Sequence, residues 1–483
     1  MGITGTSDAA PQERRANAAF ALNGLLFLAG CSNAFAAELE SQVTIGITHT
    51  DNIFLAPENE QSEIIYRLEP SFHFSQEASR ITANADYLLQ AFRYQDLSET
   101  EIFHQYDADI RAALIPDNFY LEVGGSRYQS IRDPGLRIPS SNLPISDNRQ
   151  DLDEYYAEPS FEYAFGRAIS AAGAYRHSWL QYSGPDVQDI EQEDADFSID
   201  NYRNERGLTW ALRYNWKRTE YELDIPWEYQ WAIAELGFWA GANTRLFAAA
   251  GKESAWDQPL DPKLEDDIWE AGFSQRVGEK LSAEFAVGER SFGSSWRGDL
   301  ELQFNRGTMA FSYAETPMTE GRLRYPRDAF DDPEVPPDDL LSRPGSTQRF
   351  IHKRLRWTLN LELRRSGLSF ALFDGERTER TQADGTPLGD EAERGASLNA
   401  SFRVGVRTEL RVGGWWVDRE LQDGNTSKLV RASIGAQYRL GDRTTLLLEY
   451  DYTEQDGESQ FPIQFFVAEY VANTVSLLLT RRL

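Results

Sequence analysis

The five histidines and the single cysteine carry the widest range of chemistry in this sequence of 483 residues. The histidines are scattered and form neither an H-E-x-x-H motif nor another paired spacing of metal ligands. One cysteine cannot build a disulfide framework or a cysteine-based zinc site. His73 shares a polar strand face with Asp86 and is the best placed base, but a lone histidine in a charged wall is more often neutral and hydrogen-bonded. These residues therefore predict no metal site.

The serines offer no catalytic arrangement either. No G-x-S-x-G motif is present, although a barrel enzyme would not require one. The neighbouring pair His177 and Ser178 cannot act together on a regular strand, because adjacent side chains point to opposite faces. No nucleophile, base and oxyanion donor converge in the pattern. The sequence thus predicts a protein without catalytic residues, cofactor or enzyme activity.

The elements that must position these side chains are strands with one apolar and one polar face. From Ile64 to Phe74 the even positions are mostly apolar, whereas the odd positions of residues 67–75 are polar or charged. Strand side chains alternate with a period of two, so each such segment has two chemically different faces. The same alternation recurs around residues 81–90, 105–114, 208–215, 300–305, 354–364 and 430–440.

A closed transmembrane barrel accounts for this pattern. Beyond the N-terminal segment there is no run of about 18 apolar residues, so no transmembrane helix is expected. A membrane protein without such helices must close its strands into a barrel, since every backbone group in lipid needs a hydrogen-bond partner. Aromatic residues make up 12% of the chain, which suits rings at the membrane interfaces. We predict an all-β, antiparallel outer-membrane β-barrel of about 22 strands (roughly 20–24) over residues 37–483, in the bacterial outer membrane.

Connections between the segments alternate in length, as in outer-membrane barrels with short periplasmic turns and long extracellular loops. Short turns are predicted near residues 76–79, 116–118, 165–167, 241–243, 278–280, 305–307, 365–367 and 441–443. Long loops are predicted at residues 133–151, 184–200, 257–267, 316–348 and 374–393. An even strand count places both termini in the periplasm. The alternative of a secreted sandwich, propeller or β-helix would need a core on one face, whereas nearly every strand here carries a polar face.

The N-terminal residues resemble a secretory targeting segment. Arg14 and Arg15 precede the apolar residues 18–30, and Ala34-Phe35-Ala36 follows as an A-x-A cleavage site. This order of charged, apolar and small residues is typical of a signal peptide. We therefore assign residues 1–36 to a cleaved signal peptide.

A second interpretation of the same segment stays open. Leu28-Ala29-Gly30-Cys31 has the form of a bacterial lipobox. In that alternative the lipoprotein signal is 1–30, and Cys31 becomes the lipidated N-terminus. Both interpretations export the protein from the cytoplasm.

The formal net charge of −29 disfavours a nucleic-acid partner, because phosphate neutralisation needs a basic surface. Much of the excess lies in the acidic residues 184–196 and 328–339. These stretches are open to two interpretations. One is divalent-cation binding at the lipopolysaccharide surface, since hard cations take carboxylate oxygens; the other is a solvated charge run. Neither stretch has the EF-hand spacing.

The polar strand faces predict a lumen wall of mixed charge. Its members are Arg67, Glu69, His73, Asp86, Asp107, Asp109, Arg111, Arg213, Arg354, Arg356, Glu362, Arg431, Arg439, Glu449 and Asp451. Mixed signs suit weak contacts with a passing polar solute, and passage needs binding that is favourable but easily left.

Motifs near the start of the predicted barrel carry a family resemblance. They are Thr50–Pro57 (TDNIFLAP), Glu69-Pro70, Ala83–Tyr87 (ANADY), His104-Gln105 with Ala108-Asp109, and Leu114–Asp117 (LIPD). Together they resemble the PEP-CTERM system-associated outer-membrane protein family over about the first third of the chain, although the lipobox-like Cys31 departs from that family. The resemblance implies a barrel of exopolysaccharide-producing Gram-negative bacteria with an exosortase sorting system. It transfers no catalytic residue.

We therefore expect an outer-membrane conduit or assembly component associated with exopolysaccharide export, with no chemistry of its own. One alternative is a loop-plugged scaffold that docks periplasmic synthesis proteins. Another is a barrel enzyme acting on lipid or glycan. The partners expected are outer-membrane lipids and lipopolysaccharide, the outer-membrane assembly machinery, exopolysaccharide and periplasmic export proteins.

Overall fold

The structure of this protein is a computed structural model. It describes residues 37–184, 187–201, 207–257, 264–322, 341, 343, 345–382, 385–422, 424–458 and 469–483. The predicted signal peptide, the alternative lipidation at Cys31 and the acidic residues 328–339 lie outside the described residues.

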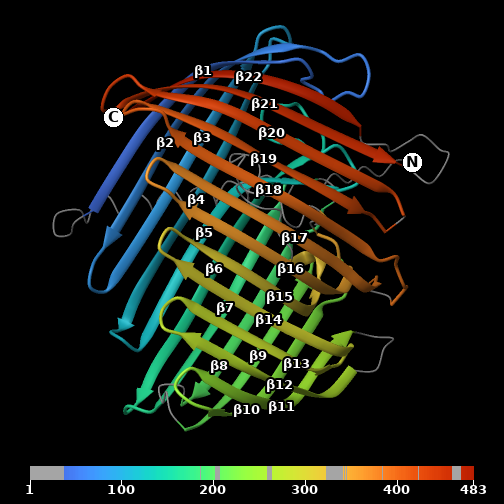
Figure 1. The fold of residues 1–483 in the computed structure, drawn as a ribbon. Coiled ribbons are helices and arrows are strands. Elements are labelled where there is room, and N and C mark those ends of the chain that lie inside the picture. Colours follow the sequence, from blue (N-terminus) through green and yellow to red (C-terminus); the bar gives the residue numbers. More distant parts are fainter. Residues whose placement is uncertain are drawn as a thin grey trace, which may run out of the picture.

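The described residues form 22 strands and one short 3-10 turn, and each strand pairs antiparallel with the next along the chain (Figure 1). The prediction of an all-β barrel of about 22 strands is confirmed. Within this described part, no helix has the length and apolar character needed to cross a bilayer. The elements are β1 (Ala37–Thr50), β2 (Glu63–Glu77), β3 (Ile81–Tyr94), β4 (Thr100–Ile115), β5 (Phe119–Ile131), β6 (Arg149–Phe165), β7 (Ile169–Tyr182), β8 (Ile190–Asp200), β9 (Leu208–Tyr221), β10 (Trp227–Trp239), β11 (Thr244–Asp257), β12 (Leu264–Val277), β13 (Leu281–Arg290), β14 (Gly293–Phe304), β15 (Gly307–Thr319), η1 (Glu320–Arg322), β16 (Arg349–Glu362), β17 (Ser366–Thr381), β18 (Glu391–Arg403), β19 (Thr408–Glu420), β20 (Thr426–Arg439), β21 (Thr444–Glu458) and β22 (Tyr470–Arg482).

The last strand closes the sheet onto the first. β1 and β22 pair antiparallel over Gln42–Thr50 and Thr474–Arg482. Inside the barrel the seam carries a hydroxyl contact, 2.9 Å between Thr48 Oγ1 and Ser476 Oγ. This closure removes both edge strands, so every strand of the sheet has two neighbours.

The outer face of the barrel is a continuous apolar surface. Leu236 and Leu246 on neighbouring strands are 62% and 52% exposed. Large apolar side chains are exposed at the same outward positions on other strands, namely Ile45, Ile47, Tyr66, Leu68, Leu212, Phe273, Val287, Leu398, Val412, Ile434, Leu448 and Leu477. A surface of this extent would be an aggregation hazard in water. It is the outward apolar band that a membrane barrel presents to lipid.

Connections at the two ends of the barrel differ in length, as predicted. The end that holds Ala37 and Leu483 has tight turns, and glycines with positive φ supply several of them, including Gly166 (φ 70°) and Gly241 (φ 111°). The opposite end carries the long connections, which are extracellular by the usual layout.

Three predicted loop boundaries were wrong. β8 occupies Ile190–Asp200, inside the predicted loop 184–200, and β17 and β18 extend far into the predicted loop 374–393. The sequence misled here because these stretches are charged on both faces. A strand that extends beyond the lipid band keeps its backbone pairing without an apolar face.

Candidate functional site

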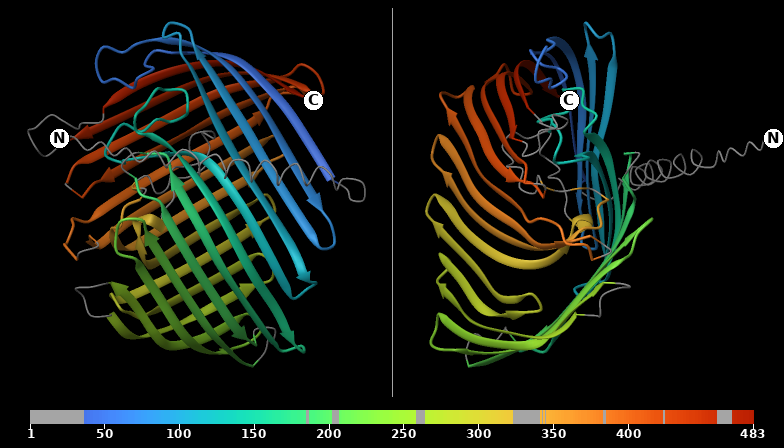
Figure 2. Two further views of the ribbon diagram at one scale, coloured as in Figure 1. Left: turned by 180° about the vertical axis from the view of Figure 1, so that it is seen from behind. Right: turned by 90° about the vertical axis from the view of Figure 1, so that its right-hand side faces the viewer.

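Two long connections turn inward and occupy the extracellular part of the lumen. One is residues 132–148 between β5 and β6, and the other is η1 with residues 345–348 between β15 and β16. Figure 2 shows both segments between the walls of the barrel. We call these residues the loop plug. Loop residues so placed leave water, so their polar groups need partners from the wall.

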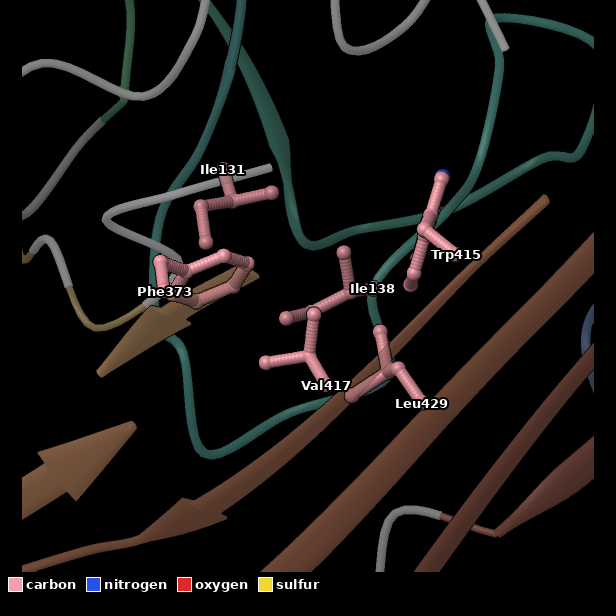
Figure 3. Close-up of a cluster of buried hydrophobic side chains, with 6 residues drawn as sticks. All are labelled: Ile131, Ile138, Phe373, Trp415, Val417 and Leu429. Atoms are coloured by element: carbon pink, nitrogen blue, oxygen red, sulfur yellow. The ribbon is translucent and has the colours of Figure 1, made fainter. Parts of the chain in front are cut away.

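An apolar cluster joins the loop plug to the far wall. Ile138 of the plug and Ile131 at the end of β5 pack against Phe373 and Val417 (Figure 3). The other two members are Trp415 and Leu429. All six side chains are less than a tenth exposed. Burial of each stabilises the contact by about 1.5–3 kcal/mol, so the loop is packed against β17, β19 and β20.

Wall side chains satisfy the backbone of residues 132–148. Arg419 donates to the carbonyl of Pro134 at 2.9 Å, and Arg431 donates to that of Ser140 at 2.9 Å. Gln455 receives a hydrogen bond from Ile138 N at 2.9 Å. These wall groups come from β19, β20 and β21, so three strands hold the loop through hydrogen bonds.

The β1–β2 connection packs against the same loop. Ile53 is fully buried in a cluster with Leu143 of the plug and Tyr94 of β3. The carbonyl of Ile53 accepts a hydrogen bond from Ile145 N at 2.9 Å, and Arg137 donates to the carbonyl of Leu55 at 2.7 Å. The loop is therefore held from both sides of the β1–β22 seam.

The η1 turn is tied to β8, β9 and β10. Arg322 Nη1 lies 2.7 Å from Asp194 Oδ1, and its Nη2 donates to the carbonyls of Glu193 and Arg218. The carbonyl of Gly321 accepts a hydrogen bond from Gln192 at 2.6 Å. The η1 turn of the plug thus contacts strands that lie several positions away from β15 in the sheet.

A buried ionic cluster fixes the other side of this connection. Glu320 Oε1 lies 2.9 Å from Arg377 Nη1 and 3.6 Å from Arg343 Nη1. Glu391 Oε1 lies 2.5 Å from Arg343 Nη2 and 3.2 Å from Arg380 Nη1. Three guanidinium groups therefore meet two carboxylates, and all of these side chains are at most 1% exposed except that of Arg343, which is 16% exposed. Removing one partner of such a buried pair typically costs about 3–5 kcal/mol, because it leaves a charge without compensation.

A β-bulge makes this cluster possible. Arg377 and Arg380 are three residues apart, so a regular strand would point them to opposite faces. The register between β16 and β17 shifts between Arg349 and Ile351, and Glu379 has a positive φ of 54°. The extra residue turns both arginines inward, which is a common use of bulges.

Burial changes the ionisation of the loop members of the cluster. Burial raises the pKa of the Glu320 carboxyl, and the charges of Arg377 and Arg343 act against that rise. Burial acts to lower the pKa of Arg343, but its hydrogen bond and charge interaction with Glu391 raise it overall. The arginine is thus charged throughout the physiological range.

Several residues predicted to line the lumen form pairs on the inward strand faces. Arg67 Nη2 lies 2.7 Å from Glu69 Oε1, and His73 Nδ1 lies 2.8 Å from Asp86 Oδ1. Arg431 Nη2 lies 3.2 Å from Asp451 Oδ1.

The other predicted lumen residues are spread over the wall. Asp109 accepts hydrogen bonds from Asn84, and the Arg111 guanidinium lies 4.4 Å from the centre of the Tyr120 ring. Asp107, Arg213, Arg354, Arg356, Glu362, Arg439 and Glu449 lie on strands β4, β9, β16, β20 and β21. Among the described residues, no three His, Cys, Asp or Glu side chains are placed to share a metal ion. Their lining of an open passage stays a prediction.

The alternation of polar and apolar residues did not predict the ion-pair partners of the lumen residues or the wall residues that pack against the loop plug. Arg213 pairs with Glu235, which also receives Arg245, and neither partner was singled out from the sequence. The anchors at Trp415 and Val417 had a visible signal, since Trp415-Trp416-Val417 breaks the alternation with apolar residues on both faces. Such a break in a barrel strand marks a lumen position that is packed against protein.

No catalytic arrangement gathers around the histidines considered above. His73 and Asp86 are about half exposed. His177 packs against the ring of Trp179 at 4.2 Å, whereas Ser178 accepts a hydrogen bond from Arg176 on the other strand face.

No protein-family profile and no curated protein matches this sequence. Among solved structures, the barrel is similar to a mutant form of the ferric enterobactin receptor PfeA from Pseudomonas aeruginosa. The identity is 9% and the TM-score 0.51, over 93% of this chain and 81% of that chain. It is also similar to the FrpB iron transporter from Neisseria meningitidis, with 9% identity and a TM-score of 0.52 over 92% and 81% of the two chains.

This likeness agrees with the closed 22-stranded sheet and its exposed apolar band. The chain is a bacterial outer-membrane β-barrel. At these identities the comparison concerns the fold, and the barrel's cargo has to be argued from its own residues.

Proposed function

We propose that this barrel is a gated conduit of the outer membrane, closed at rest by its own loop plug. The observation that supports this proposal is the set of tethers on residues 132–148. They are hydrogen bonds and apolar contacts with the β1–β2 connection, β3, β17 and β19–β22, and none of those described is covalent. Barrels of 22 strands enclose a lumen wide enough to need a plug. A plug held by such noncovalent contacts can be released.

The cargo that we propose is polysaccharide or its building blocks, moved in connection with exopolysaccharide export. Two features support this: the resemblance of residues 50–117 to exopolysaccharide-linked barrels, and a mixed-charge wall that suits weak contacts with sugars. The solved barrels with this fold are named for ferric enterobactin and iron transport, and at 9% identity we do not transfer that cargo.

A reversible crosslink tests the gate directly. Ser140 Oγ of the plug lies 3.1 Å from Thr453 Oγ1 on β21, so Ser140→Cys with Thr453→Cys places two thiols within reach. In planar bilayers, we expect the oxidised double variant to stay closed and the reduced form to show opening events like those of the wild type.

A loosened plug is the complementary test. Arg419→Ala with Arg431→Ala removes two tethers, and we expect larger or more frequent conductance steps. Arg394→Ala, which changes an exposed arginine on the outer face of β18, is the matched control. If neither the wild type nor the loosened variant conducts, the scaffold alternative replaces the conduit.

The cargo has a separate test in cells. A strain that lacks this protein should export less surface polysaccharide, and the wild-type gene should restore it. An unchanged amount of exported polysaccharide would contradict the exopolysaccharide assignment, but it would not contradict the proposed gate.

A further inference from the structure

A polar cavity of about 350 Å³ opens at the extracellular end of the barrel. Four connections supply its lining. They are Gln188 between β7 and β8, Asp224 between β9 and β10, residues 345–348 between β15 and β16, and Gln382 between β17 and β18. Segments far apart in the sequence therefore converge on one small volume.

The lining of this cavity is unusual for a ligand site. Pockets for small molecules are mostly apolar, yet this one is lined by three glutamines, Ser346, Thr347, Asp224 and Gly345. Carboxamides and hydroxyls each donate and accept hydrogen bonds. Among the residues that the structure describes, no lysine or arginine lines the cavity to attract an anion, and no aromatic or aliphatic side chain lines it to attract an apolar group. The complementary ligand is neutral and rich in hydroxyl groups.

Hydrogen bonds hold the walls of the cavity in place. Gln188 donates to the carbonyl of Gly345 at 2.8 Å and accepts from Leu223 N at 3.1 Å, which joins three connections. Thr347 Oγ1 donates to Asp224 Oδ2 at 2.9 Å. Walls that are already ordered lose little conformational freedom when a ligand binds. The cavity is therefore preorganised.

We propose that this cavity binds a neutral saccharide at the cell surface. Its volume lies at the small end of the range for ligand pockets, which suits about one or two sugar rings. The inference deepens the proposed function and rests on it in one respect, because residues 345–348 belong to the loop plug. Gln348 also accepts a hydrogen bond from the buried Arg380. Ligand bound in the cavity therefore touches the connection that closes the barrel.

Calorimetric titration of the full chain tests the site. The protein is kept in an amine-oxide detergent, since glucoside or maltoside detergents would compete. The probes are glucose, galactose, N-acetylglucosamine, lactose and cellobiose, with glucuronate as the acidic comparison. We expect a neutral sugar to bind with a Kd of about 1 mM. Glucuronate should bind more weakly than its neutral counterpart glucose, because Asp224 repels a carboxylate.

Substitutions locate the binding. Gln382→Leu and Thr347→Val should each weaken binding of the best probe at least about tenfold. Gln303→Leu and Thr308→Val make the same chemical changes at the periplasmic end and should leave binding unchanged. The gel mobility of each variant before and after boiling shows whether the barrel has folded.

Three results would overturn the proposal: no binding of any neutral probe up to about 100 mM, tighter binding of glucuronate than of glucose, or full binding by folded Gln382→Leu and Thr347→Val. The outcome is separate from that of the gate. Sugar binding without conductance would contradict only the proposal of a conduit. Conductance without sugar binding would contradict only the proposed saccharide site.

Discussion

Arg377 shows at the residue scale how the lumen holds charge without water. Its side chain is 1% exposed and faces two carboxylates, Glu320 and Glu391. The desolvation of these groups is offset only while all of them are present. The cluster therefore serves mainly to fix the position of η1, and its contribution to net stability is smaller.

The substitution Arg377→Met should therefore free η1 from this fixed position. With Glu320 left less compensated, residues 345–348 should exchange backbone hydrogens faster, by about a hundredfold for a loss of about 3 kcal/mol. Hydrogen-exchange mass spectrometry measures this rate. Arg394→Met removes an ion pair of the outer face, where Arg394 is 67% exposed, and should leave the exchange unchanged. Equal exchange in both variants would show that the cluster does not hold the connection.

The two faces of β16 give a second test at this scale. Leu359 pairs with Met309 and Phe370 on the apolar outer face, whereas Asn360 points inward and is exposed. A charge at the lipid midplane costs about 2–4 kcal/mol. We expect Leu359→Arg to impair membrane assembly and Asn360→Arg to be tolerated, as judged by the folded band on unboiled gels. Equal assembly would mean that the faces are assigned the wrong way round.

The sequence predicted which face of a strand a residue occupies, but not the residue with which it pairs. The inward position of Arg213 follows from alternation along β9. Its pairing with Glu235 depends on the register between β9 and β10, where Ile233 lies opposite Arg213. Register is set by turns and by packing against neighbours, and neither can be read from one strand.

At the scale of elements, strands were predictable wherever lipid imposes an apolar face. β16 follows the alternation from Arg354 to Glu362, and β20 follows it from Val430 to Arg439. The errors lie in β8, all of which was assigned to a loop, and at the extracellular ends of β17 and β18, where no lipid selects the sequence. The bulge at Glu379 and the inward path of residues 132–148 were also missed, because both depend on contacts with other strands.

The last strand should be indispensable for closure. β22 pairs with β1 through Gln42–Thr50 and with β21 on its other side. Deletion of residues 478–483 removes the partners of residues 42–46, which opens the barrel at its periplasmic end. We expect the truncated chain to fail to insert, as measured by its loss from the outer-membrane fraction.

A single substitution at the C-terminus is the control for that truncation. Leu483→Phe changes one side chain beyond the end of β22 and keeps every strand pair. It should insert as well as the wild type or better. Normal insertion of the truncated chain would mean that the barrel closes through other contacts.

Across the whole molecule, the same closure explains why the fold is robust once formed. The β1–β22 seam joins residues more than 420 positions apart, as in the contact between Thr48 and Ser476. Contacts this distant form slowly, since loop-closure entropy is lost before they stabilise the chain. Once the seam forms, no strand edge remains from which the sheet could unravel.

The closed sheet should therefore resist detergent until it is heated. In sodium dodecyl sulfate, the unboiled protein should remain a compact barrel and migrate differently from the boiled, unfolded chain. The reason is that all 22 strands are paired on both sides, and detergent can cover their outward apolar band as lipid does. The native protein should also fractionate with the outer membrane. Recovery as a soluble periplasmic or secreted species, or one mobility under both conditions, would contradict a barrel closed by β1 and β22.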